Sequence, residues 1–452
     1  MTPEIEIIYF LFAFLGMLYT FNKVGITSVS ILFVLVFWEG LIDYLDTIYF
    51  DFLLSTYKIG IVAYAVLLVW KKRNRFKNKA DLAINLSFFL FTASFWITYS
   101  LYGGELLTIL SQYLYKYAFI WIVYHYLKDI IYNIPKREYV KKVLMTILYV
   151  QIAIALIKIF LIGFRIEGLV GTMSYGGGGP AVVIPIMALI FYWLIQNGKF
   201  SKKDWIFTGL ILIIAIASGK RQPIVIFPTI LFFLFVFVNQ TIKIVKLLQY
   251  TLVAVVVFYI GVRLTPTFTP EKEVGGSFDL TFVSNYIEKY YFGSDEDRSF
   301  SEKGRIGVGR GAGVFLYFNP EMLTLISNKE LLFGKGIYEV AIGKYGRFTA
   351  GGRSNYGINH EGLIGEGGAL IYTIGYVGSI LLVVFVLSIV FSMKNKKLAW
   401  IIFFNFLWDI FLYYNQMIFF NSSGLIVLVI IFYSNSMENE KMLNLRRSLN
   451  TT

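Results

Sequence analysis

Basic, acidic and histidine side chains gather in a glycine-rich stretch, GRFTAGGRSNYGINHEGLIGEGG at 346–368, directly before a long apolar run. The stretch contains His360, one of only two histidines, with Arg353 before it and Glu361 after it. An imidazole placed between a carboxylate and a guanidinium can take a proton from a hydroxyl near neutral pH. A purely structural histidine is the alternative. We therefore treat His360 and Glu361 as candidate catalytic residues.

A second cationic motif is IASGKRQPIV, in which residues 218–221 form a short hairpin between two apolar runs. Arg221 directly precedes a predicted helix with Pro223 in its first turn. Free N–H groups at a helix start, beside a guanidinium, bind anions. The alternative is a pair of cations that snorkel to the membrane surface. Further candidate anion-binding arginines are Arg165, before a GGGGP turn, and Arg305, Arg310 and Arg353 in a long polar segment.

The composition shows which elements must position these residues. Hydrophobic residues make up 57% of the chain and charged residues only 15%, against about a quarter charged in soluble proteins. Apolar windows long enough to cross a bilayer as helix recur throughout the chain. We therefore predict an all-α integral membrane protein with about 12–14 transmembrane helices. The acidic N-terminus, MTPEIEIIYF, predicts that the first apolar run is retained as a span.

Composition also excludes several kinds of site. The absence of cysteine excludes disulfides, iron–sulfur clusters and thiolate zinc, and two histidines exclude a histidine-rich metal centre. We predict no metal and no cofactor. The net charge of +13 lies in short clusters between apolar runs. Cytoplasmic loops facing anionic lipid explain that pattern, so we predict no nucleic-acid partner.

Thirteen spans are predicted from the apolar runs: 5–22, 25–48, 55–70, 81–101, 105–127, 142–163, 179–197, 204–218, 222–239, 246–264, 367–392, 398–414 and 417–434. Basic clusters at 71–79, 128–142, 199–203, 243–246, 394–397 and 446–447 all fall on one side of the membrane with this count. The positive-inside rule makes that side cytoplasmic, with the N-terminus outside and the C-terminus inside.

This topology divides the chain into three parts. Residues 1–264 hold the first ten spans, 265–366 form one large extracytoplasmic loop, and 367–452 hold the last spans and a short cytoplasmic tail. Every candidate arginine and His360 then lies on the outer side. Ionisable residues inside the spans normally pair between helices, with a proton path as the alternative; they are Glu39, Asp43, Lys116, His125, Lys158 and Asp409.

Residues 160 to 395 resemble the O-antigen polymerase and O-antigen ligase superfamily. The resemblance rests on an arginine ahead of a glycine-rich turn, the Ser-x-x-Arg hairpin, and a long external loop with GKGIYE. That loop ends in a histidine before a glycine-rich apolar span, GLIGEGGALIYTIGYVGSILL. By position, Arg165, Arg221, one of Arg305 and Arg310, and His360 match the family's functional residues. The resemblance implies a fold like that of type C glycosyltransferases.

The resemblance also implies an activity and a location. Members transfer a glycan from undecaprenyl pyrophosphate to a hydroxyl of another lipid-linked repeat unit, or to lipid A core in ligases. The arginines would stabilise the departing pyrophosphate without a metal, and His360 or a nearby carboxylate would activate the acceptor, with inversion. We expect a bacterial cytoplasmic membrane location, and a flippase and a chain-length regulator as partners. The alternatives are a ligase and a flippase for lipid-linked oligosaccharides.

Overall fold

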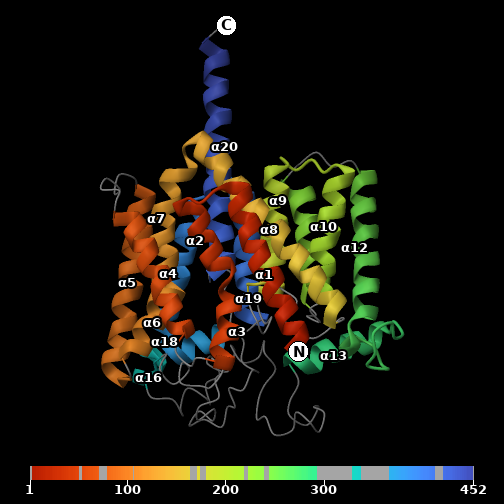
Figure 1. The fold of residues 1–452 in the computed structure, drawn as a ribbon, viewed down its shortest axis with the longest axis horizontal. Coiled ribbons are helices and arrows are strands. Elements are labelled where there is room, and N and C mark those ends of the chain that lie inside the picture. Colours follow the sequence, from red (N-terminus) through yellow and green to blue (C-terminus); the bar gives the residue numbers. More distant parts are fainter. Residues whose placement is uncertain are drawn as a thin grey trace.

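The computed structural model describes residues 3–49, 53–70, 79–104, 106–162, 171–173, 180–217, 222–238, 244–292, 328–336, 366–412 and 421–450. Within these ranges every regular element is a helix, and none is a strand. The predicted all-α class is therefore confirmed, and the helices form one bundle with their long axes roughly aligned (Figure 1).

The first part of the bundle contains α1 (Pro3–Val24), α2 (Ser28–Phe37), α3 (Glu39–Tyr49), α4 (Leu53–Trp70), α5 (Lys79–Tyr102), α6 (Leu106–Tyr113), the π-helix η1 (Leu114–Ala118), α7 (Phe119–Ile131) and α8 (Ile134–Ile162). The second part contains α9 (Pro180–Ile195), α10 (Lys202–Ala217), α11 (Gln222–Phe232), the π-helix η2 (Phe233–Val238), α12 (Ile244–Leu264), the 3₁₀-helix η3 (Pro266–Phe268), α13 (Leu280–Phe292), α16 (Asn328–Phe333), α18 (Glu366–Phe391), α19 (Lys396–Leu412) and α20 (Asn421–Asn450).

Five of the described helices are long and apolar enough to cross a membrane. They contain the stretches Glu6–Val24, Leu53–Trp70, Asp81–Tyr102, Ile134–Leu161 and Leu370–Phe391, and α2 with α3 adds a sixth if this pair, bent by 48°, is one span. The chain is therefore a multi-pass helical membrane protein. Each of the thirteen predicted ranges overlaps one helix or a run of consecutive helices, while the number of crossings stays a prediction.

Three boundaries differ from those predicted, and each difference has a physical reason. The range 25–48 is two helices, α2 and α3, that meet at Trp38. α8 starts at residue 134 rather than 142, and α20 continues to 450 rather than ending near 434. These polar extensions support each other, because Arg137 Nη1 lies 2.9 Å from Ser436 Oγ and 3.1 Å from Glu440 Oε2.

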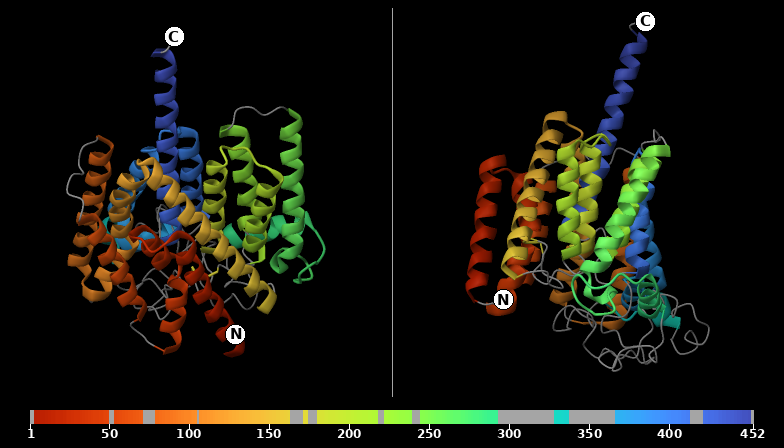
Figure 2. Two further views of the ribbon diagram at one scale, coloured as in Figure 1. Left: turned by 45° about the horizontal axis from the view of Figure 1, so that its top comes forward. Right: turned by 90° about the vertical axis from the view of Figure 1, so that its right-hand side faces the viewer.

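The two ends of the bundle differ in character. α13, α16, the N-terminus and the first turns of α18 lie at one end (Figure 1). The α7–α8 and α9–α10 connections lie at the other, where α20 projects beyond the rest of the bundle (Figures 1 and 2). The predicted large loop, 265–366, thus contributes its described helices η3, α13 and α16 to the end opposite those basic connections.

Two apolar clusters pack within the described part of the chain. The main core surrounds α20, whose residues 425–432 are all almost completely buried, and it includes side chains from α2, α7, α8, α9 and α18. A smaller group, here called the satellite cluster, contains Ile216, Ile224, Val262, Phe268 and Val283. It joins the end of α10 and the start of α11 to α12, η3 and α13.

Candidate functional site

The predicted site residues fall in four stretches between described elements. Arg165, Arg221, Arg305, Arg310, Arg353, His360 and Glu361 all lie outside the described residues. The structure describes the helix ends and buried contacts on either side of these stretches.

The flanking helix ends gather at one end of the bundle. α8 ends three residues before Arg165, α11 begins directly after Arg221, and α18 begins five residues after Glu361. These ends lie where α13 and α16 are drawn (Figure 1). The helix ends next to the candidate residues thus lie at the same end of the bundle, opposite the basic α7–α8 and α9–α10 connections (Figure 1).

The satellite cluster fixes the helix ends on both sides of Arg221. Ile216 lies in the last turn of α10 and Ile224 in the first turn of α11. Both pack with Phe268 of η3 and Val283 of α13. α11 and α12 also approach closely, since a Cβ at Gly261 would lie 2.7 Å from Ile224 Cγ2. The two helix ends that flank Arg221 therefore pack against three elements that follow them in sequence, α12, η3 and α13.

The stretch that contains Arg165 returns deep into the bundle at residues 171–173. The Thr172 amide donates to Gln151 Oε1 at 2.7 Å, and the Thr172 hydroxyl donates to the Phe37 carbonyl at 2.9 Å. Gln151 is eleven residues before the end of α8, which places Thr172 about 16 Å along the axis from that end. Residues 171–173, between α8 and α9 in the sequence, therefore lie inside the bundle.

The α2–α3 bend and a lysine of α8 both contact this buried segment. The Gly40 amide donates to the Thr172 carbonyl at 2.9 Å, next to the α2–α3 bend. Lys158 Nζ donates to the Gly171 carbonyl at 2.7 Å and lies 4.3 Å from the centre of the Tyr9 ring. Non-helical backbone at membrane depth must find its hydrogen bonds within the protein, and side chains of α8 supply them here.

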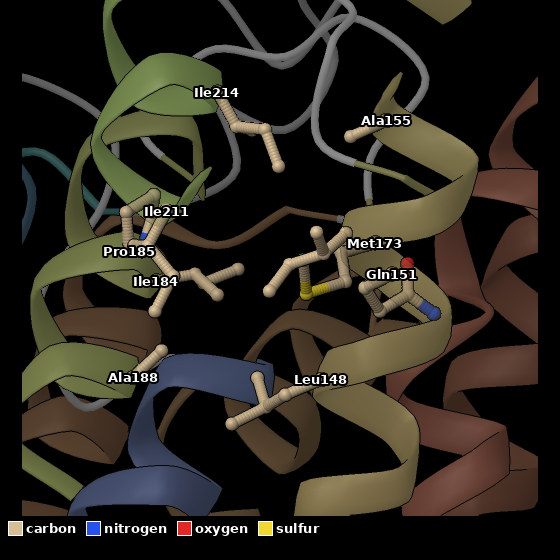
Figure 3. A pocket seen from close by; sticks show the side chains of 10 residues that line it. Leu148, Gln151, Ala155, Met173, Ile184, Pro185, Ala188, Ile211 and Ile214 are labelled. Carbon is tan, nitrogen blue, oxygen red and sulfur yellow. The ribbon is translucent and has the colours of Figure 1, made fainter. Parts of the chain in front are cut away.

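An apolar hollow adjoins the same segment. Ala155 and Gln151 of α8, Ile184 of α9, Ile214 of α10 and Met173 line it, with neighbouring aliphatic residues of the same helices (Figure 3). Ala155 lies two turns from the α8 end that leads to Arg165. Ile214 lies one turn from the α10 end that leads to Arg221. The hollow therefore places apolar surface one to two turns from the helix ends that lead to Arg165 and Arg221.

The helices that line the hollow also form part of the outer surface of the bundle. Tyr149 of α8 and Ile213 of α10, which alternate with the lining residues, are exposed, each by about half. In a membrane such apolar surface contacts lipid tails. A hydrocarbon chain in the hollow would thus lie next to the bilayer interior rather than in an isolated void.

A third contact involves the GKG part of GKGIYE. α18 is interrupted at Gly375, where φ is 67° and ψ is −175°. Next to the interruption, the Lys335 amide donates to the Tyr372 carbonyl at 2.7 Å and the Gly336 amide donates to the Thr373 carbonyl at 2.9 Å. The segment after α16 is therefore seated on a break in a membrane-embedded helix.

Pairing between helices, predicted for the ionisable residues inside the spans, is found for Glu39, whereas Lys158 contacts a backbone carbonyl and an aromatic ring. Glu39 accepts a hydrogen bond from Tyr115 and lies 3.5 Å from Lys58 Nζ. His125 Nε2 lies 2.9 Å from Asn85 Oδ1. Sequence reasoning missed Lys58, Asn85 and Gln151 as partners, because a polar residue in an apolar helix is visible in the sequence while its facing neighbour is not.

Comparisons with known proteins do not assign the chain to a family. No family model, no curated protein and no solved structure matches the chain. Fold and contacts define its class as an all-helical, multi-pass membrane protein with polar, non-helical segments packed into the bundle.

Proposed function

We propose that this chain is a polysaccharide polymerase of the outer face of a bacterial cytoplasmic membrane. It transfers a glycan from undecaprenyl pyrophosphate to a hydroxyl of another lipid-linked repeat unit, with inversion and without a metal. In this proposal all thirteen predicted ranges cross the membrane, and the end with α13 and α16 faces outward. The fold is then similar to that of type C glycosyltransferases.

The apolar hollow is the observation that carries the proposal. A lipid-linked donor has a hydrocarbon tail directly joined to a doubly charged headgroup. Its site must therefore place hydrocarbon-binding surface next to cations. The hollow between α8, α9 and α10 lies one or two turns beneath the helix ends that lead to Arg165 and Arg221. This order of apolar and cationic groups is the order of the donor itself.

The proposed chemistry assigns a role to each candidate residue. Arg165, Arg221, Arg353 and one of Arg305 and Arg310 hold the pyrophosphate, whose negative charge grows as the C1–O bond breaks. His360, with Glu361 beside it, takes the proton of the acceptor hydroxyl as that oxygen attacks C1. The pyrophosphate leaves on the lipid, and the proton on the imidazole passes to solvent.

The test uses variants expressed at equal levels in the native host with the chromosomal copy deleted. Arg221→Ala and His360→Ala should each reduce chain extension about 100- to 1,000-fold, the usual effect of losing one transition-state contact. Lys203→Ala, an exposed residue at the basic end of α10, is the matched control and should leave the glycan ladder unchanged. The readout is the length distribution of the glycan on gels.

The same cells separate the alternatives. A polymerase defect leaves single repeat units on their acceptor, while a ligase defect leaves full-length polymer on the lipid carrier. A flippase defect leaves lipid-linked repeat units facing the cytoplasm, where an externally added glycosidase cannot reach them. Normal ladders in both arginine and histidine variants would contradict the proposed roles.

A further inference from the structure

The contact between the segment after α16 and the interrupted helix α18 is built for close approach of two backbones. We call it the α16–α18 joint and define it as residues 332–336 with 372–375. Gly334 and Gly375 both have positive φ, 73° and 67°. A Cβ on Gly375 would lie 2.3 Å from the Leu332 carbonyl oxygen, and one on Gly334 would lie 2.5 Å from the Ile374 nitrogen. No side chain fits at either position.

Hydrogen bonds explain why the backbones meet so closely. Tyr372 and Thr373 are buried, and their carbonyls accept from the amides of residues 335 and 336. Leaving a buried carbonyl without a donor costs about 1–3 kcal/mol. The break in α18 therefore depends on the incoming segment, and the segment can reach it only because both close-approach positions are glycine.

Contacts with α5 hold the joint from a second side. Thr98 Oγ1 donates to the Phe333 carbonyl at 2.6 Å, and Lys329 Nζ lies 5.6 Å from the centre of the Tyr102 ring. α5 in turn packs along α18 within the main core. The short helix α16 is thus fixed against two long helices, although it has no buried residue of its own.

The joint fixes both ends of the next stretch of chain. Residues 337–365 leave the joint at Gly336 and re-enter the same helix at Glu366. Thr373, which Gly336 contacts, is seven residues along α18 from Glu366, about 10 Å along the axis. Closing a loop onto one rigid element removes much of the freedom its ends would have.

We propose that the α16–α18 joint is a positioning device for residues 337–365, with Gly334 and Gly375 as its positioning residues. That stretch contains Arg353, His360 and Glu361, so the joint sets where the chain that carries them starts relative to α18. Arg305 and Arg310 lie on the other side of α16 and are positioned separately. The catalytic consequence rests on the proposed function, while the existence of the joint does not.

The joint itself is tested by cysteine pairing, for which the chain is a suitable background because it has no cysteine. Lys335→Cys with Tyr372→Cys places two thiols on residues whose backbones are hydrogen bonded, within the range of a disulfide. A protease site inserted between residues 337 and 365 makes a cross-linked chain run as one band after cleavage. Lys335→Cys with Val384→Cys, further along α18, is the negative pair.

Glycine replacements then connect the joint to activity. Gly375→Ala and, as a second and milder variant, Gly334→Ala should abolish the cross-link and reduce polymer about 100-fold, at normal protein abundance. Gly25→Ala is the matched control: Gly25 has φ of 83° with nothing within 4 Å, so it tests positive φ without close approach. It should keep both the cross-link and the polymer.

Each result decides between the possibilities. No cross-link in the Lys335→Cys, Tyr372→Cys chain, or an unchanged cross-link after Gly375→Ala, overturns the joint. A lost cross-link with wild-type polymer overturns its positioning role. If the unmodified chain makes no polymer in any host, the proposed function fails while the cross-linking result still stands.

Discussion

Polar side chains in the interior of this protein hold irregular backbone in place. Gln151 and Thr172 form a reciprocal pair, in which the glutamine amide nitrogen donates to the threonine hydroxyl at 2.7 Å and its oxygen accepts the threonine amide at 2.7 Å. Both residues are almost fully buried. In hydrocarbon surroundings such pairs replace the water that would otherwise satisfy the chain.

Replacing Thr172 should therefore destabilise the protein without changing its packing volume. Thr172→Val leaves Gln151 Nε2 and the Phe37 carbonyl without their partner, at about 1–3 kcal/mol for each group. Thr172→Ser keeps the hydroxyl and is the control. Thermal unfolding in detergent should give a clearly lower Tm for valine than for serine, and equal values for valine, serine and wild type would contradict the described hydrogen bonds.

The sequence alone identified some of these residues and not others. Lys158 and Glu39 stand out because a charge within an apolar run is costly. Gln151 is uncharged and carries no such signal. Its role depends on which face α8 turns toward residues 171–173, and that orientation is set by packing of helices distant in the chain.

At the scale of elements, glycines decide how closely helices approach. Gly261 of α12 lies against Ile224 of α11, with no room for a methyl group. Gly209 of α10 has nothing within 4 Å of the place where a Cβ would be. The same residue type is therefore essential at one helix contact and replaceable at another.

Gly261→Ala should force α11 away from α12 and shift the helix start that follows Arg221. Overpacking of this kind costs about 1–3 kcal/mol, and we expect lower Tm together with shorter glycan chains. Adding Ile224→Val makes room and should restore part of both. Gly209→Ala should resemble wild type, and an equal loss in both glycine variants would contradict the proposed contact.

Helix positions were largely predictable because long apolar runs have few alternatives in a bilayer. Breaks within them were not. The α2–α3 bend at Trp38 has no proline or glycine pair at that position, and it is held by the indole N–H donating to the Ala13 carbonyl at 2.9 Å. The interruption of α18 at Gly375 depends on residues 335 and 336, about forty residues earlier in the chain.

At the scale of the molecule, the predicted orientation follows from charge. The α7–α8 and α9–α10 connections, which contain basic clusters, lie at the end from which α20 projects (Figure 1). The positive-inside rule assigns this end to the cytoplasm. In the predicted orientation the opposite end, with η3, α13 and α16 (Figure 1), faces outward.

Single cysteines in the cysteine-free chain test this orientation directly. Lys199 and Glu273 are both exposed. Lys199 lies in the α9–α10 connection at one end of the bundle, and Glu273 lies between η3 and α13 at the other. A membrane-impermeant maleimide applied to spheroplasts should modify Glu273→Cys and leave Lys199→Cys unmodified until the cells are opened. Labelling in the reverse order would show that the topology is inverted.

The division of the interior into a large core and a small satellite cluster has a thermal consequence. Among the described residues, five buried side chains and a few partly buried ones tie η3 and α13 to α10, α11 and α12, whereas residues 425–432 of α20 are almost completely buried in the main core. Small packed units open at lower free energy than the whole molecule. On warming, amide protons of α12 and α13 should therefore exchange with solvent well before those of residues 425–432 in α20. The satellite cluster, which packs the helix ends on both sides of Arg221, would then be the first part of the protein to loosen.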